Sequence, residues 1–150
     1  MLSLTNEMKR EIIMEHYNSP NNKVEDITKI SNFEKFRKIR MDSDSCIDDI
    51  TIYLDIENDV IKNAYFSGVA CAISTASTDI LCDMVKNKSE KDALYIISQY
   101  ENMLYEKEYD SEVLEELNAF SETHKQAARI KCATLGAFGI SKILNGENDE

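Results

Sequence analysis

The spacing of apolar side chains changes along the chain, and each change predicts a different element. Residues 4–17 carry apolar side chains three and four positions apart, which predicts an amphipathic helix. The proline and asparagines of residues 18–22 end that helix. Residues 23–42 show no clear period, apart from a strand predicted near 36–42. From residue 49 apolar and polar side chains alternate, which predicts a half-buried strand.

A hairpin and a series of helices follow this strand. Residues 57–59 are typical of a turn, and residues 60–66 are predicted to return as a second strand that ends at Gly68. Beyond it, helical periods and a capping box at Ser89 predict further helices. These helices are expected at about 72–86, 89–104, 113–120 and 130–144. The pattern predicts an α+β fold, with a small antiparallel β-sheet packed against several α-helices.

Composition narrows the class of protein. With 150 residues, 43% hydrophobic and 30% charged, the chain is expected to form one globular domain over 1–150. No apolar stretch approaches the roughly 20 residues that span a bilayer. The charged N-terminal segment does not resemble a signal peptide, so a cytoplasmic location is expected. A net charge of −11 argues against a nucleic-acid partner.

The cysteines are the candidate chemical groups. The predicted hairpin brings Cys46, Asp48 and Cys71 to one end of the sheet, because antiparallel strands lie about 5 Å apart. Cys71 and Cys132 both fall near predicted helix starts, where free N–H groups favour a thiolate. Three thiolates and one carboxylate suit zinc. Since no Cys-x-x-Cys motif is present, separately buried cysteines remain the alternative on these grounds.

Four other side chains have plainer interpretations. Cys82 is eleven residues beyond Cys71 on the same predicted helix, or about 16 Å along it, so it is expected to be a packing or surface cysteine. His16 is expected on a helix surface or at an interface. His124 and Lys131 are expected to be solvated, and His124 could become a ligand only if its loop folded back. The acidic tail, 145–150, is expected to be disordered.

Four sequence motifs carry a resemblance to a known family. They are IIMEHYNSPNN (12–22), CIDD (46–49), SGVACAISTAS (67–77) and ARIKCATLG (128–136). In order and content they resemble the U-type scaffold family of iron–sulfur cluster assembly (IscU, NifU and SufU), most closely its SufU branch. The resemblance implies a SufE/NifU-like fold. It also implies that Cys46, Asp48, Cys71 and Cys132 bind zinc, or alternatively a transient iron–sulfur cluster.

Two features favour the SufU branch. Lys131 stands where IscU-type scaffolds have a histidine, and the long segment 87–125 matches an insertion in the SufU branch. The resemblance then implies a zinc-dependent sulfurtransferase of the SUF system, in which Cys46 accepts persulfide sulfur from a SufS-like cysteine desulfurase. Arg129 is expected beside the site, and a downstream SUF assembly complex is a further expected partner.

Two other functions remain open at this point. One is a scaffold on which a [2Fe–2S] cluster is assembled and transferred, and the other is a purely structural zinc domain. The chain also departs from the family pattern, because Ile47 and Ala70 replace glycines beside the predicted ligands, and an aromatic residue is replaced near Ala137. The loss of two glycines is expected to stiffen the loops around the metal.

Overall fold

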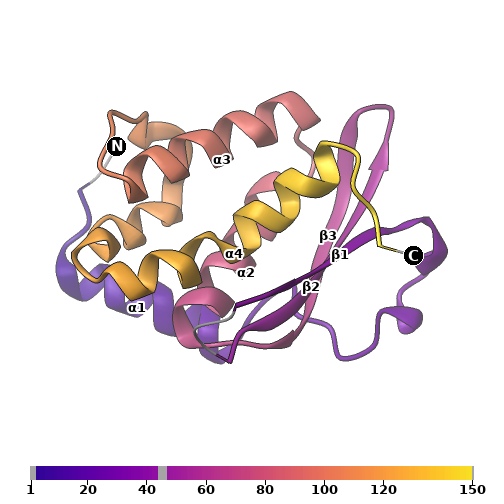
Figure 1. The fold of residues 1–150 in the computed structure, drawn as a ribbon, viewed down its shortest axis with the longest axis horizontal. Coiled ribbons are helices and arrows are strands. Elements are labelled where there is room, and N and C mark those ends of the chain that lie inside the picture. The colour runs from indigo at the N-terminus through magenta and orange to yellow at the C-terminus, as the bar shows by residue number, and fades with distance from the viewer. Residues whose placement is uncertain (1–2, 44–46, 150) are drawn as a thin grey trace.

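The structure is a computed structural model, and it describes residues 3–43 and 47–149. Cys46 therefore lies outside the described residues. The elements run in the following order (Figure 1): α1 (Asn6–Asn18), η1 (Ile27–Lys29), η2 (Phe33–Lys35), β1 (Arg37–Asp42), β2 (Asp49–Glu57), β3 (Val60–Val69), α2 (Ala72–Val85), α3 (Glu90–Leu104), η3 (Ser111–Phe120), η4 (Thr123–Lys125) and α4 (Ala127–Leu144).

The described strands form an antiparallel sheet in the order β1-β2-β3. The β2–β3 hairpin closes through Asn58 and Asp59, whose φ angles of 51° and 63° are those of the two-residue turn that matches strand twist. The α+β class, the predicted strand near 36–42 and the hairpin are confirmed. Alternate side chains of β2 are buried, as its sequence pattern predicts.

Gly68 does not end the second strand, contrary to the prediction. It pairs with Ile50, and β3 continues to Val69. Its φ of +113° is rarely adopted by other residues, and a Cβ here would lie only 2.1 Å from the carbonyl oxygen of Asp49. The glycine therefore lets the hairpin stay paired up to the residues that precede Cys71.

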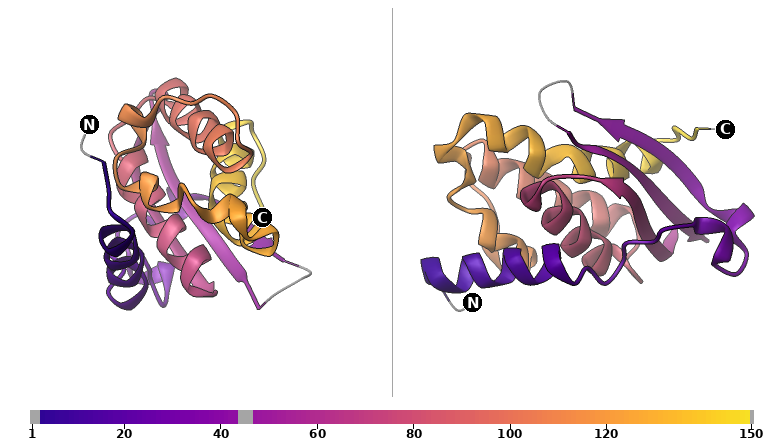
Figure 2. Two further views of the ribbon diagram at one scale, coloured as in Figure 1. Left: turned by 90° about the vertical axis from the view of Figure 1, so that its left-hand side faces the viewer. Right: turned by 90° about the horizontal axis from the view of Figure 1, so that it is seen from below.

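The helices cover one face of the sheet, as the views in Figure 2 show. Helix α2 packs on β3, while α4 packs on β1 and β2. Between these layers lies the core, to which the inner face of the sheet contributes a fully buried apolar row: Ile50, Ile52, Leu54, Ile61, Ala64 and Phe66. Removal of apolar side chains such as these from water is the main favourable contribution to the free energy of folding.

Small side chains bring α2 and α4 close together. A Cβ at Gly136 would lie 2.4 Å from Oγ1 and 3.0 Å from Cβ of Thr78. Ala133 and Ala137, on the same helix, are also fully buried. Since Cys71 caps α2 and Cys132 lies on α4, this close approach determines how near the two cysteines come.

The segment 113–120 and the C-terminal tail differ from prediction. The segment predicted as a helix at 113–120 is the 3₁₀ element η3, interrupted at Glu115, where φ is 45° and ψ is −120°. The described residues of the tail, 145–149, reach the edge strand β1, where the Asp149 N–H donates to the Lys38 carbonyl oxygen at 2.8 Å, so the expected disorder does not describe them. The described part of the chain contains no helix with the length and apolar character needed to cross a membrane.

Candidate metal centre

Asp48 and Cys71 meet at the open end of the β2–β3 hairpin. The register pairs Asp49 with Val69, so the residue before β2 lies beside the residues that follow β3. The Cys71 N–H donates to Asp48 Oδ1 at 2.7 Å, and Asp48 Oδ2 lies 3.8 Å from Cys71 Sγ. Asp48 is only 1% exposed. A buried carboxylate is costly unless it is hydrogen-bonded or bound to a cation, which makes this position informative.

The start of helix α2 favours a negative charge on Cys71. Cys71 is the N-cap residue, and its Sγ accepts from the Ser74 N–H at 3.4 Å. A helix N-terminus offers unpaired N–H groups and the positive end of the helix dipole, and both stabilise a thiolate. Cys132 differs, because it lies in the second turn of α4 rather than at its start.

The structure brings three of the four predicted ligands together. The ligand atoms of Asp48, Cys71 and Cys132 all lie within 4.8 Å of one another. Two thiolates that share one zinc ion at about 2.3 Å lie no more than about 4.6 Å apart, which is close to the upper bound on the separations in this group. Two thiols and a carboxylate at these separations fit the donor set that zinc takes in proteins. Cys46, the fourth predicted ligand, lies outside the described residues.

Cys82 is a packing cysteine, as predicted. It is fully buried in the core and belongs to no described group of metal-ligand side chains. Burial, together with the charge of Asp79, raises the pKa of its thiol well above the usual range, so it stays protonated.

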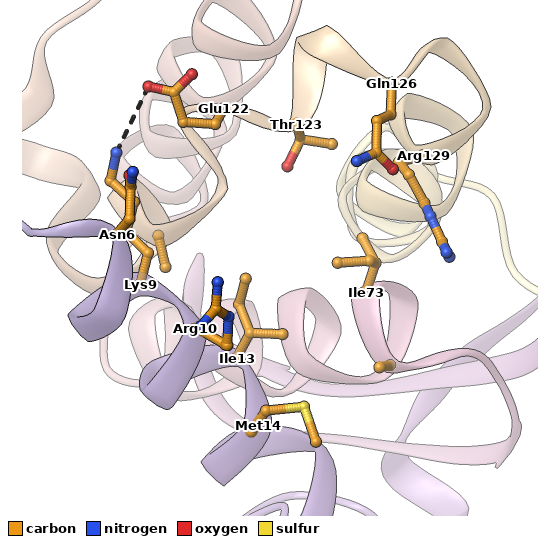
Figure 3. A pocket seen from close by; sticks show the side chains of 12 residues that line it. Asn6, Lys9, Arg10, Ile13, Met14, Ile73, Glu122, Thr123, Gln126 and Arg129 are labelled. Carbon is orange, nitrogen blue, oxygen red and sulfur yellow. Dashed lines mark ion pairs between the residues drawn. The ribbon is translucent and has the colours of Figure 1, made fainter.

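Arg129 and Lys131 are exposed on the first turns of α4. Arg129 lines a cleft with Ile73, two residues beyond Cys71, as shown in Figure 3. His124 does not join the Asp48–Cys71–Cys132 group. It is partly buried, and its Nδ1 hydrogen-bonds with the Ser121 carbonyl oxygen at 3.0 Å.

His16 is buried, so a place on the helix surface is wrong. Only 6% exposed, it hydrogen-bonds through Nδ1 to Asp79 Oδ2 at 2.6 Å and through Nε2 to Glu116 Oε1 at 3.1 Å. Burial by itself lowers the pKa of His16, but the bonds to Asp79 and Glu116 outweigh it and raise that pKa above the ordinary value. Its position four residues after Ile12, on the apolar side of α1, is the sequence signal for this burial.

Comparison with known proteins shows which family the chain belongs to. The family model of the NifU-like N-terminal domain matches residues 8–136. The chain belongs to this family. It is a scaffold-type family of iron–sulfur cluster assembly that also includes a zinc-dependent sulfurtransferase, which agrees with the resemblance carried by the sequence motifs.

Individual relatives of the NifU-like family span most of the chain. The zinc-dependent sulfurtransferase SufU of Bacillus subtilis is 32% identical over 134 residues, covering 89% of this chain and 86% of its own. The iron–sulfur cluster assembly scaffold protein IscU of Thermotoga maritima is 31% identical, covering 91% and 92%. Since these two relatives match about equally well, identity alone does not separate sulfur transfer from scaffolding.

A solved structure supports the same fold. The crystal structure of a protein from Fervidobacterium islandicum AW-1, described as a candidate iron–sulfur cluster assembly scaffold for the SUF system, superposes with a TM-score of 0.76 at 29% identity. The match covers 89% of this chain and 94% of that one.

Proposed function

We propose that this protein is a zinc-dependent sulfurtransferase of iron–sulfur cluster biogenesis. In this proposal Cys46 accepts persulfide sulfur from a cysteine desulfurase, and Cys46, Asp48, Cys71 and Cys132 form the zinc site. The observation that carries the proposal is the Asp48–Cys71–Cys132 group, with ligand atoms within 4.8 Å of one another, in a chain 32% identical to a zinc-dependent sulfurtransferase.

The proposed reaction is a thiolate–persulfide exchange. The Cys46 thiolate attacks the outer sulfur of the donor's persulfide, a new sulfur–sulfur bond forms on Cys46, and the donor's cysteine leaves as a thiolate. One sulfur–sulfur bond forms as another breaks, so no external oxidant or reductant is needed. When bound, zinc would supply a positive charge that keeps its cysteine ligands deprotonated at neutral pH.

The residues around Cys46 have separate roles in this proposal. Asp48 contributes a carboxylate whose position is held by the Cys71 N–H at 2.7 Å. A carboxylate is a harder ligand than a thiolate and binds zinc less strongly, so it is the ligand that the metal exchanges most readily in this set. Arg129, exposed near the start of α4, contributes a positive charge toward the anionic persulfide of the donor.

Exposed apolar side chains beside the centre support the docking of a protein donor. Ile47 is 69% exposed and Val69 is 64% exposed, and they directly precede Asp48 and Ala70. Two exposed apolar side chains at the same end of the hairpin offer a partner protein a surface to contact beside the centre. We propose that the desulfurase covers this edge of the hairpin when sulfur is transferred.

Lys131 favours transfer over scaffolding. Its side chain is exposed immediately before Cys132, at the position where IscU-type scaffolds have a histidine. An ammonium group has no lone pair for a metal, whereas a neutral imidazole does. The scaffold function, supported by the similarity to the Thermotoga maritima protein, remains the alternative that the experiment must separate.

Labelled cysteine provides the test. The zinc-loaded protein is incubated with a cysteine desulfurase and sulfur-labelled cysteine, and its peptides are examined by mass spectrometry. We expect one added sulfur atom on the peptide that contains Cys46, and none in Cys46→Ala. The matched control is Cys82→Ala, which removes a buried thiol outside the centre and is expected to accept sulfur as the wild type does.

Three outcomes would contradict the proposal. Label on Cys71 or Cys132 in the wild type would show that the acceptor is misassigned. No label, together with a stable cluster reconstituted from iron and sulfide, would favour the scaffold. No label, no cluster and no stimulation of the desulfurase, with one zinc ion bound, would favour a structural zinc domain.

A further inference from the structure

A cleft beside the candidate metal centre has the size of a small-molecule site. It lies between α1, the start of α2 and the segment that leads into α4, and its volume is about 450 Å³ (Figure 3). Ligand pockets commonly have volumes of about 300–1,000 Å³. None of the three described centre residues lines it, so the cleft is a separate space that adjoins the centre.

The charged side chains of the cleft are mostly cationic. Lys9 and Arg10 come from α1, and Arg129 comes from the opposite wall on α4 (Figure 3). The single carboxylate in the lining, Glu122, already pairs with Lys125 at 2.7 Å and with Lys9 at 3.8 Å. Such a concentration of positive charge is notable in a chain with a net charge of −11.

The two arginines keep their hydrogen-bonding capacity. Among residues 3–43 and 47–149, neither Arg10 nor Arg129 forms an ion pair, although acidic side chains outnumber basic ones in the chain by 28 to 17. Guanidinium groups bind carboxylate, phosphate and sulfonate oxygens through paired N–H donors. Two of them on facing walls suit a ligand with two anionic groups.

The remaining lining is largely apolar. Ile13 and Met14 of α1, and Ala72 and Ile73 of α2, line the cleft together with the buried Ala119. An apolar lining with a few convergent charged groups is the usual character of a site for an organic ligand, whereas a fully hydrated inorganic ion gains nothing from apolar walls.

We propose that this cleft binds a small organic dianion with an apolar body, held between Arg10 and Arg129. Bound there, the ligand lies against Ile73, two residues beyond Cys71, and against the helical turn that precedes Cys132. This places an anionic small molecule next to the candidate metal centre. The proposal goes beyond the proposed function and does not depend on it, because binding requires neither zinc nor a desulfurase.

An NMR titration tests the proposal with naphthalene disulfonate as the probe. This compound joins two anionic groups to an apolar ring system, while naphthol keeps the rings without the charges, and sulfate keeps the charge without the rings. We expect saturable amide shifts centred on residues 9–14, 72–73 and 126–129 with the disulfonate, and clearly weaker binding of naphthol and sulfate.

Variants then locate the site. Arg10→Gln and Arg129→Gln are each expected to weaken disulfonate binding about tenfold, the loss of one charge-assisted interaction of about 1.4 kcal/mol. The matched control is Arg40→Gln, which makes the same change of charge on β1, where Arg40 pairs with Asp49 at 2.7 Å. That control is expected to bind the disulfonate as the wild type does.

Other results would overturn the proposal. Shifts centred elsewhere, or equal affinities in the three arginine variants, would show that the cleft is not the site. Equal binding of sulfate would show a simple anion site with no role for the apolar walls. If no small anion binds, yet both cleft variants lose affinity for the desulfurase, the cleft is a protein-docking surface. All these readouts are independent of sulfur transfer, so their failure leaves the proposed function standing.

Discussion

Two clusters of metal-ligand side chains in this protein have similar dimensions and different chemistry. One is the Asp48–Cys71–Cys132 group at the hairpin end, and the other, which we term the His16 cluster, consists of His16, Asp79 and Asp83. In each cluster the ligand atoms lie within 4.8 Å of one another. Proximity alone therefore does not distinguish a metal centre from a structural contact.

The hydrogen bonds to Asp79 and the type of ligand atom in the other group make the difference. Asp79 accepts from His16 at 2.6 Å, from the Asn22 N–H at 2.8 Å and from the Asn21 N–H at 3.1 Å, and Asn22 Nδ2 also bonds to Asp83 at 2.9 Å. These bonds already use the lone pairs that a metal would need. In the other group the sulfur atoms are weak hydrogen-bond acceptors, and they bind zinc far better than they bind N–H groups.

The comparison indicates two functions for similar clusters. The His16 cluster joins α1, the turn after it and α2 by charge-assisted hydrogen bonds, and its contribution is to stability. The Asp48–Cys71–Cys132 group joins the hairpin to α2 and α4 mainly through atoms that suit a metal. Substitutions in the His16 cluster should therefore lower mainly the stability of the fold. Substitutions in the Asp48–Cys71–Cys132 group should lower mainly the affinity for zinc.

The largest expected effect on stability is that of Asp79→Ala. This substitution leaves the buried His16 and the buried N–H of Asn22 without their acceptor, together with the partly buried N–H of Asn21. It is expected to lower the free energy of unfolding by about 3–5 kcal/mol. Urea denaturation measures the loss. The control Asp83→Ala, at an exposed position, should cost much less, and equal losses in the two variants would contradict the role assigned to Asp79.

Cys132→Ser is expected to change zinc affinity much more than it changes the stability of the fold. If Cys132 is a zinc ligand, as proposed, its removal should lower zinc affinity by more than about 100-fold, since loss of an indirect partner of a metal ligand already costs about 10–100-fold. Competition with a chromophoric chelator measures this affinity. Cys82→Ala serves as its control and should retain one zinc ion per chain. Unchanged zinc affinity in Cys132→Ser would remove Cys132 from the site.

Gly136→Ala tests whether the approach of α2 and α4 sets the geometry of the centre. The added methyl group would collide with Thr78, and we expect a loss of about 1–3 kcal/mol in stability together with weaker zinc binding. Gly139→Ala is the matched change. Its methyl group would lie 2.9 Å from Cγ1 of Ile52 and 3.0 Å from Cγ of Met41, both on the sheet, so stability should fall while zinc affinity stays the same. If Gly136→Ala binds zinc as tightly as the wild type does, the centre tolerates movement of α4.

The smallest expected effect is a dependence of stability on pH through His16. Its pKa in the folded protein is raised above the usual value of about 6.5. The charged imidazole therefore stabilises the fold fully below the unfolded pKa, and this contribution is lost as the pH rises through the folded pKa. Denaturation of the wild type and of His16→Gln should differ most at the acidic end of this window and converge above it. A constant difference across that range would assign the effect of His16 to packing alone.

Local sequence was enough to predict most of the fold. Helical spacing, the alternation in β2 and the turn residues 57–59 depend on neighbours a few positions away, so the elements followed from the chain itself. The meeting of Asp48 and Cys71 also followed, because antiparallel pairing places the start of the first strand beside the end of the second. The interruption at Glu115 was missed, since its backbone angles are unusual for a residue other than glycine.

Contacts between distant segments decided the rest. Cys132 joins Asp48 and Cys71 only because α4 packs closely on α2 through Gly136, and no local pattern states that distance. His16 is buried because Asp79, 63 residues away, supplies the carboxylate that makes its burial favourable. Sequence alone thus determined which residue types were available and which elements they formed. The tertiary structure decided which of them meet, because packing free energy depends on surfaces that come together only in the folded chain.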